Sequence, residues 1–132
     1  MARLAAIHCT DRDVEDLRRM CSEIRKVRTW HEYSMHDTMF HNTLGEICGN
    51  VLLAEMAALG IGVQFAHMWR ERVPDSLGPN PDFPTHAEHL AVVEAMARRD
   101  DKAAADAMRT HLQCAIVRFE QMAPHPWTLD RT

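Results

Sequence analysis

The side chains with the clearest capacity for chemistry are one aspartate and three of the chain's nine histidines. Asp37 and His41 are four residues apart, so on a helix they share one face with Leu44. His89 is in phase with apolar residues of a later helical segment, and His111 continues an apolar stripe in the last one. If these segments are helices of one bundle, all four polar side chains point into its interior.

Inward polar groups of this kind need partners, because burying even a neutral group without one costs roughly 2–7 kcal/mol. A shared metal ion would satisfy all four, and metal sites in helical bundles combine pairs of ligands one turn apart with ligands from facing helices. Three imidazoles and one carboxylate suit zinc, nickel, manganese or iron. The alternative is that each inward histidine is a hydrogen-bonded core residue and holds no metal.

The composition is that of a compact globular protein. The chain has 132 residues, of which 46% are hydrophobic and 26% charged, which excludes a disordered or collagen-like chain and fits a single domain. Its formal net charge of −4 offers no surface field that attracts a nucleic-acid backbone, so direct DNA binding by this chain is not expected.

The cysteines and the hydropathy pattern indicate a cytoplasmic protein. The four cysteines are widely spaced and form no C-x-x-C pair, so neither a zinc ribbon nor a redox motif is predicted, and we expect reduced, buried thiols. No apolar run approaches the roughly 20 residues that span a bilayer. The N-terminus lacks the charged and then apolar pattern of a secretory leader.

The elements that position the candidate ligands are predicted to be helices only. β-Branched residues are few, no stretch alternates polar and apolar residues, and helix-favouring residues dominate. The predicted helices are Met1–Ile7, Thr10–Thr29, His31–Cys48, Val51–Arg72, Thr85–Arg99 and one from Asp100 or Asp101 to Met122. The fold class is therefore all-α, an antiparallel bundle of about six helices.

Local signals set the ends of these helices. Thr10 begins one as an N-cap, and Gly49 with Asn50 closes the third, because these residue types tolerate the left-handed conformation. Thr85 and Glu88 have the spacing of a capping box that opens the fifth helix. The segment 73–84 holds four prolines and must be a loop, placed where it could cover a pocket. Gly60 and Gly62 could bend the fourth helix, and residues 122–132 are predicted to be a flexible tail.

At the candidate ligands the sequence resembles a known family. The segment Asp37–His41, followed by Leu44 and then Gly49 and Asn50, is similar to the D-x-x-F-H…L…G-N motif of the FCD domain, the C-terminal effector domain of FadR-type GntR transcription regulators. Each motif is short, but the order and the separation of the motifs are specific to this family.

The second half of the chain matches the family in the same way. Glu88 and His89, the end of their helix at 98–100, the stretch Ala104–Met108, and His111 resemble the family's E-H…D…A…M…H-L pattern. The resemblance covers residues 2 to 118, so residues 1–121 are predicted to form an FCD-like effector-binding domain.

The resemblance implies a function for the whole domain. It implies a bundle of six or seven helices around a metal bound by the residues matching Asp37, His41, His89 and His111. It also implies homodimers, a small carboxylate effector bound beside the metal, and a fused winged helix whose binding to DNA the effector controls. The winged helix precedes this domain in the family and is absent from this chain, so the chain is expected to be a fragment or a natural truncation.

Three further residues are candidates for binding the effector. His67 is in phase with the apolar residues of the fourth helix, and Arg70 and Arg72 precede the proline-rich loop, where a guanidinium could form paired bonds to a carboxylate. Solvated surface arginines and a plain core or rim histidine are the alternatives. His86 lies three residues before His89, but its first-turn position favours a surface or capping role.

The competing function is that of a small helical-bundle metalloenzyme. Such an enzyme needs a general base, yet no H-E-x-x-H motif occurs, and the acid nearest a ligand, Glu88, is assigned to a capping box. A di-iron centre would need two E-x-x-H motifs with further inward glutamates, which Glu32 and Glu46 do not supply. We therefore expect a sensor domain rather than an enzyme.

Overall fold

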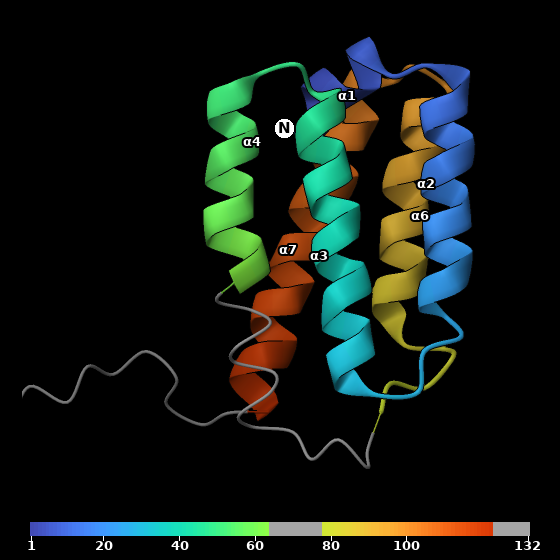
Figure 1. Cartoon of the computed structure of the whole chain (residues 1–132), viewed down its shortest axis with the longest axis vertical. Coiled ribbons are helices and arrows are strands. Elements are labelled where there is room, and N and C mark those ends of the chain that lie inside the picture. The colour runs from blue at the N-terminus through green and yellow to red at the C-terminus, as the bar shows by residue number, and fades with distance from the viewer. Residues whose placement is uncertain (64–77, 123–132) are drawn as a thin grey trace, which may run out of the picture.

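The computed structural model describes residues 1–63 and 78–122, and all regular structure in these ranges is helical. The helices are α1 (Ala2–His8), α2 (Asp11–Ile24), α3 (Trp30–Ile47), α4 (Val51–Ala57), the π-helix η1 (Ala58–Val63), α6 (Pro84–Ala97) and α7 (Asp101–Met122). The helices α2, α3, α4, α6 and α7 lie side by side along the long axis, with α1 across one end (Figure 1). Successive long helices run in opposite directions, so the predicted all-α antiparallel bundle is confirmed.

Two capping boxes set the entry of the chain into α2 and α3. Thr10 accepts a hydrogen bond from the Asp13 backbone N–H, and the Asp13 carboxylate accepts one from the Thr10 N–H, as the predicted N-cap requires. Thr29 and Glu32 form the same arrangement at the start of α3. The prediction that the second helix reaches Thr29 was therefore wrong, because Thr29 caps the next helix and α2 ends at Ile24.

The sharp end of α3 agrees with the sequence. Gly49 has φ of +69°, a left-handed conformation that favours glycine. A Cβ on Gly49 would lie 2.9 Å from Nδ1 of His8. That nitrogen donates a hydrogen bond to the Cys48 carbonyl. Asn50 then caps α4 by accepting from the Leu53 N–H. Glycine is needed here for both its backbone conformation and its small size.

The fourth predicted helix differs from the structure. A single α-helix over Val51–Arg72 was expected, but α4 ends at Ala57 and the chain continues as the π-helix η1 to Val63. The change comes just before Gly60 and Gly62, the two residues expected to disturb this helix, since glycine has a low helix propensity and π-turns occur as local helix irregularities. Residues 64–72 of the prediction lie outside the described residues.

The entries to α6 and α7 contrast with each other. Asp100 caps α7 by accepting from the Ala103 N–H at 2.9 Å, which confirms one of the two predicted caps. The predicted capping box of Thr85 and Glu88 was wrong, because α6 begins at Pro84 with Phe83 in the N-cap position and no side-chain cap. Proline suits the first turn, where its missing N–H is not needed. Thr85 and Glu88 are thereby left free for other partners.

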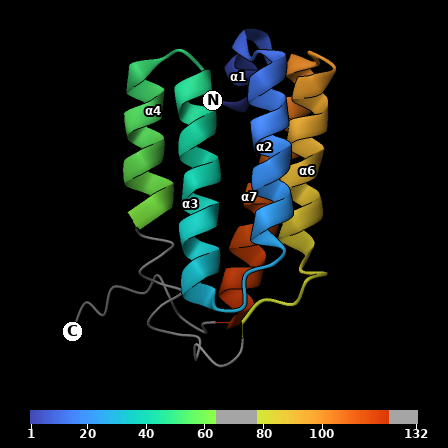
Figure 2. The ribbon, with the colours of Figure 1, turned by 45° about the vertical axis from the view of Figure 1, so that its right-hand side comes forward.

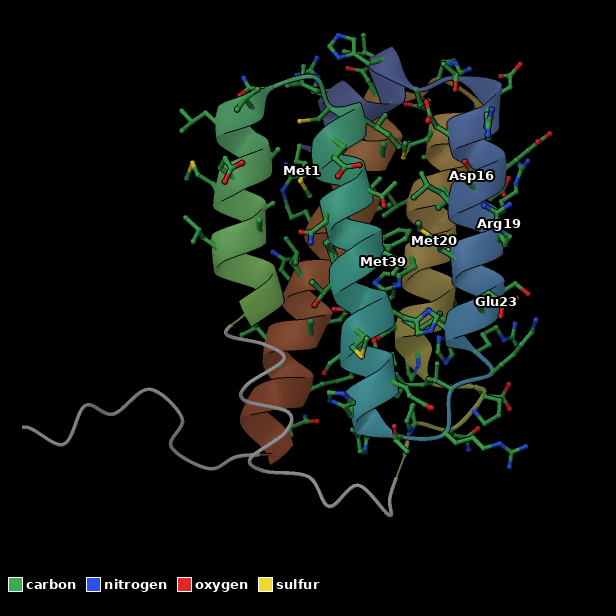
Figure 3. The ribbon with its side chains drawn as sticks, viewed as in Figure 1. Met1, Asp16, Arg19, Met20, Glu23 and Met39 are labelled. Carbon is green, nitrogen blue, oxygen red and sulfur yellow. The ribbon has the colours of Figure 1, made fainter. Side chains whose placement is uncertain are left out.

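The core is built from buried side chains of α1, α2, α3, α6 and α7, and Figure 2 shows α1 at one end of this group of helices. Its largest fully buried apolar side chains include Leu17, Phe40, Leu44 and Met96. The helix α2 shows how the sequence builds this core. Its buried positions are Val14, Leu17, Cys21 and Ile24, whereas Asp16, Arg19 and Glu23 lie on its outer side (Figure 3). One face of α2 therefore packs into the core and the opposite face meets solvent.

A smaller aromatic cluster closes the other end of the bundle. Trp30 and Tyr33 of α3 pack edge to face with each other and with Phe83, with ring centroids 5.4–5.6 Å apart. The described helices include none that is long and apolar enough to cross a membrane.

Candidate metal centre

Three helices bring the four predicted ligands to one point in the bundle. Asp37 and His41 come from α3, His89 from α6 and His111 from α7. One ligand atom from each of the four lies within 4.8 Å of the others. The helical phase read from the sequence therefore placed these side chains together correctly, although they are up to 74 residues apart in the chain.

The distances show which atoms converge. Oδ1 of Asp37 lies 3.2 Å from Nε2 of His89 and 3.8 Å from Nε2 of His41. Nε2 of His41 lies 3.3 Å from Nε2 of His111. One carboxylate oxygen and three Nε2 atoms thus face a common centre, and these are atom types that bind divalent transition metals.

The centre is closed off from bulk water on most sides. His41 and His89 are each 1% exposed and His111 is 3% exposed, whereas the Asp37 side chain keeps 19% of its surface exposed. Among the described residues, Nδ1 of His41 and both ring nitrogens of His89 have no well-oriented hydrogen-bond partner. Because buried polar atoms in proteins are nearly always paired, these unsatisfied nitrogens fit a site that binds a group.

Burial also sets the protonation of the four groups. Burial lowers the pKa of His41 to about 4, even though the Asp37 carboxylate opposes this shift, and it lowers the pKa of His89 and His111 as well. Burial alone would raise the pKa of Asp37, but the surrounding imidazoles, His41 foremost, bring that pKa to about 2. Neutral imidazoles and an ionised carboxylate are the forms that donate lone pairs to a metal.

The core holds the imidazole rings in place. Phe40, which is 2% exposed, stacks on the His89 ring at a centroid distance of 4.3 Å and meets the His41 ring edge to face at 5.5 Å. The His41 and His111 rings are stacked at 5.3 Å. Packing of this kind limits ring rotation, so the orientation of the candidate ligands depends on the apolar core as well as on polar contacts.

A second layer of polar contacts lies behind His111. Its Nδ1–H donates to Oε2 of Glu88 at 2.9 Å. Arg118 donates through Nη1 to Oε1 of Glu88 at 2.8 Å and through Nη2 to Oε2 at 2.6 Å, and it also donates to Thr85. Burial raises the pKa of Glu88, but the hydrogen bonds from Arg118 and His111 outweigh burial, and the pKa lies below its ordinary range.

Sequence reasoning missed this second layer. Glu88 was assigned to a capping box that does not form, and Arg118 was not considered. One signal could have found Arg118, because it lies seven residues after His111, two helical turns along the same face of α7. Glu88 stands in the family's E-H pattern, but that pattern does not show its role, which depends on how α6 packs against α7.

The remaining candidates are placed differently. His67, Arg70 and Arg72 lie outside the described residues. His86 is 6% exposed and packs near Tyr33 and Phe83, and α6 has no side-chain cap, so the surface or capping role expected for it was wrong. It belongs to the aromatic end of the bundle and is not one of the four converging groups.

Comparison with known proteins identifies the family. The model of the FCD domain matches residues 1–113, and the chain therefore belongs to the FCD domain family. The chain is also similar to a curated protein, the HTH-type transcriptional repressor NanR of Cronobacter sakazakii (strain ATCC BAA-894). The two are 27% identical over 125 residues, which cover 93% of this chain and 47% of NanR, so the chain spans about half the length of that relative. No solved structure matches the chain significantly.

Proposed function

We propose that this chain is the effector-sensing domain of a GntR-family transcription regulator, and that it holds one divalent transition metal and a small carboxylate. The observation that carries the proposal is the convergence of Asp37, His41, His89 and His111 within 4.8 Å in a domain that belongs to the FCD family. The metal would be zinc, nickel, manganese or iron, all of which accept imidazole and carboxylate ligands.

The donor set fits a metal ion better than it fits an ordinary hydrogen-bonded core. Three neutral imidazoles face one carboxylate oxygen, and several ring nitrogens lack partners among the described residues. Without an ion, these atoms would carry the cost of unpaired burial, about 1–3 kcal/mol each. A shared cation would remove this cost and neutralise the Asp37 charge at once.

A carboxylate effector follows from the number of donors. Four protein ligands on a six-coordinate ion leave two positions, which water or the oxygens of a small carboxylate would fill. His67, Arg70 and Arg72 remain our candidates for contacts to the rest of the effector, because imidazole and guanidinium groups bind carboxylates. Sugar acids, dicarboxylates and amino acids are the classes to test.

Regulation of DNA binding would require a second domain. The similar protein NanR is named as an HTH-type transcriptional repressor, and this chain matches about half of it. The chain itself carries a net charge of −4, which does not favour phosphate binding. We propose that residues 1–121 act as the effector-binding unit, that residues 122–132 are a tail, and that DNA is bound only through a fused winged helix.

Self-association has a candidate surface on α4 and η1. Large apolar side chains there are mostly exposed, namely Val51, Leu52, Met56 and Leu59 at 60–78%. Several large exposed apolar side chains on one element are typical of a protein–protein contact. It supports the proposed homodimer, which sedimentation of the purified chain would test.

The second layer of the centre favours a sensor over a metalloenzyme. A hydrolytic site would need a free general base near the metal. Glu88, the acid next to the ligands, already accepts two hydrogen bonds from Arg118 and one from His111. Its charge is neutralised and its oxygens are occupied, so it is poorly suited to take a proton from water.

Two experiments test this function. Elemental analysis of the purified domain should find about one transition-metal ion per chain, and the His41→Ala, His111→Ala double variant should lose it; an unchanged metal content would reject the assignment. Carboxylates should then raise the melting temperature of the metal-loaded domain much more than that of the metal-free domain. An effector that stabilises both forms equally would show that it does not contact the metal.

A further inference from the structure

We propose that Glu88 is a positioning residue of the metal centre, which, held by Arg118, keeps His111 protonated on Nδ1 so that Nε2 is free to bind the metal. This inference rests on the proposed metal site. It adds residues that are not ligands themselves but control how tightly the site binds the metal.

The hydrogen bonds around Glu88 fix the tautomer of His111. Both oxygens of Glu88 accept from the guanidinium of Arg118, at 2.8 and 2.6 Å, which is the paired geometry of an ionised carboxylate. An ionised carboxylate can only accept hydrogen bonds, so the 2.9 Å contact requires a proton on Nδ1 of His111. In a neutral imidazole the other nitrogen then carries the lone pair, and that nitrogen, Nε2, faces the centre 3.3 Å from Nε2 of His41.

This support is specific to one of the three imidazoles. Nδ1 of His41 and Nδ1 of His89 have no hydrogen-bond partner among the described residues. Their rings are held by packing, chiefly against Phe40. His111 is therefore the candidate ligand whose tautomer and ring orientation are set by a carboxylate, an arrangement that raises the basicity of metal-binding histidines.

Arg118 is itself anchored away from the centre. Its side chain is 20% exposed, its Nη2 also donates to the Thr85 hydroxyl at 3.2 Å, and its guanidinium lies 5.7 Å from the centroid of the Phe83 ring. The contacts form one chain from His111 through Glu88 and Arg118 to the first turn of α6. A change in the position of that turn would therefore alter the orientation of His111.

The fold supplies a matched control on the same helix. Glu94 of α6 also accepts two hydrogen bonds from one arginine, Arg18 of α2, at 2.7 and 2.8 Å. Both of these side chains are exposed by 40% or more, and neither is bonded to a candidate ligand. Replacing Glu94 therefore removes a glutamate–arginine pair of the same kind without touching His111.

The test compares zinc affinity across a small set of variants of the full chain. Competition with a chromogenic chelator should show that Glu88→Ala weakens zinc binding by about 10- to 100-fold, the usual effect of removing such a support. Glu88→Gln should lose less, because the amide oxygen still accepts from Nδ1–H. Arg118→Ala should also weaken zinc binding, whereas Glu94→Ala and Arg18→Ala should stay within threefold of the unmodified protein.

A second measurement reads the tautomer directly. In the metal-free protein, ¹⁵N NMR should find His111 protonated on Nδ1, a signature that Glu94→Ala keeps and Glu88→Ala loses. The same zinc affinity in Glu88→Ala and Glu94→Ala, or an Nε2-protonated His111 in the unmodified protein, would overturn the inference while leaving the metal site intact. Failure of the unmodified protein to bind zinc, nickel, manganese or iron would overturn both proposals. If Glu88→Ala does not fold, Glu88→Gln and Arg118→Ala decide.

Discussion

Replacing His41 with leucine should separate the metal's contribution to stability from that of the apolar core. His41 is 1% exposed, and leucine has a similar volume, so the substitution leaves little cavity. Its Nε2 faces the candidate metal centre and its Nδ1 has no hydrogen-bond partner among the described residues. The variant removes one candidate ligand and one unpaired buried nitrogen together.

The magnitudes for the metal-free protein nearly cancel. Removing the unpaired Nδ1 of His41 should raise the free energy of unfolding by about 1–3 kcal/mol. Removing Nε2 of His41, which contacts Nε2 of His111, should lower it by a similar amount. The free energy of unfolding of metal-free His41→Leu should therefore lie within about 1.5 kcal/mol of the unmodified protein. With metal the two proteins should differ, because a ligand at about a hundredfold above its dissociation constant adds roughly 2.7 kcal/mol.

The assay is thermal and urea unfolding with and without zinc. For a domain of this size, roughly 2.7 kcal/mol corresponds to a rise of about 8–14 °C in melting temperature, which His41→Leu should largely lose. Leu44→Met serves as the control, since Leu44 is equally buried on the same face of α3 and methionine should keep the response to zinc. A full zinc-induced rise in His41→Leu would refute the reasoning that His41 is a ligand.

Three further outcomes follow from the fold. Leu17→Ala, at a side chain with no exposed surface in the core, should lower the free energy of unfolding by about 2–5 kcal/mol in urea; a loss under about 1 kcal/mol would contradict the packing described. Gly49→Ala should cost about 1–2 kcal/mol by calorimetry, because φ of +69° strains an alanine and its Cβ would press on His8; an unchanged stability would contradict that backbone conformation. Burial raises the pKa of Cys21 to about 11, so at pH 8 iodoacetamide should modify the less buried Cys114 well before Cys21, as mass mapping would show; equal rates would argue against that burial.

The helical periodicity of the sequence predicted which side chains share a buried helix face. Asp37 and His41, one turn apart, were expected on the buried face of a helix, and the structure places them there. The cap at Thr10 and the left-handed Gly49 were predicted because each depends on neighbouring residues only. Local signals of this kind specify where helices begin, end and face, and for a bundle that is most of the fold.

Predictions from the sequence failed where two local signals competed, or where contacts with another helix determined the role of a residue. Thr29 fitted both the end of one helix and the start of the next, and the capping box with Glu32 decided in favour of the second. Thr85 and Glu88 had the spacing of a capping box, but Glu88 is held by Arg118 and His111 of α7 instead. The spacing of residues along one helix does not show which side chains of another helix they contact.

The distribution of the centre's residues suggests how it could act as a sensor. α6 and α7 carry His89, His111 and the supporting pair Glu88 and Arg118, and the two helices stay joined by these bonds without any metal. Asp37 reaches them from α3 through His89. A bound metal would therefore chiefly tie α3 to the α6–α7 pair. Because η1 packs against α3 and leads in sequence to the effector candidates His67 and Arg70, occupancy of the centre and contacts to an effector would act on the same helix.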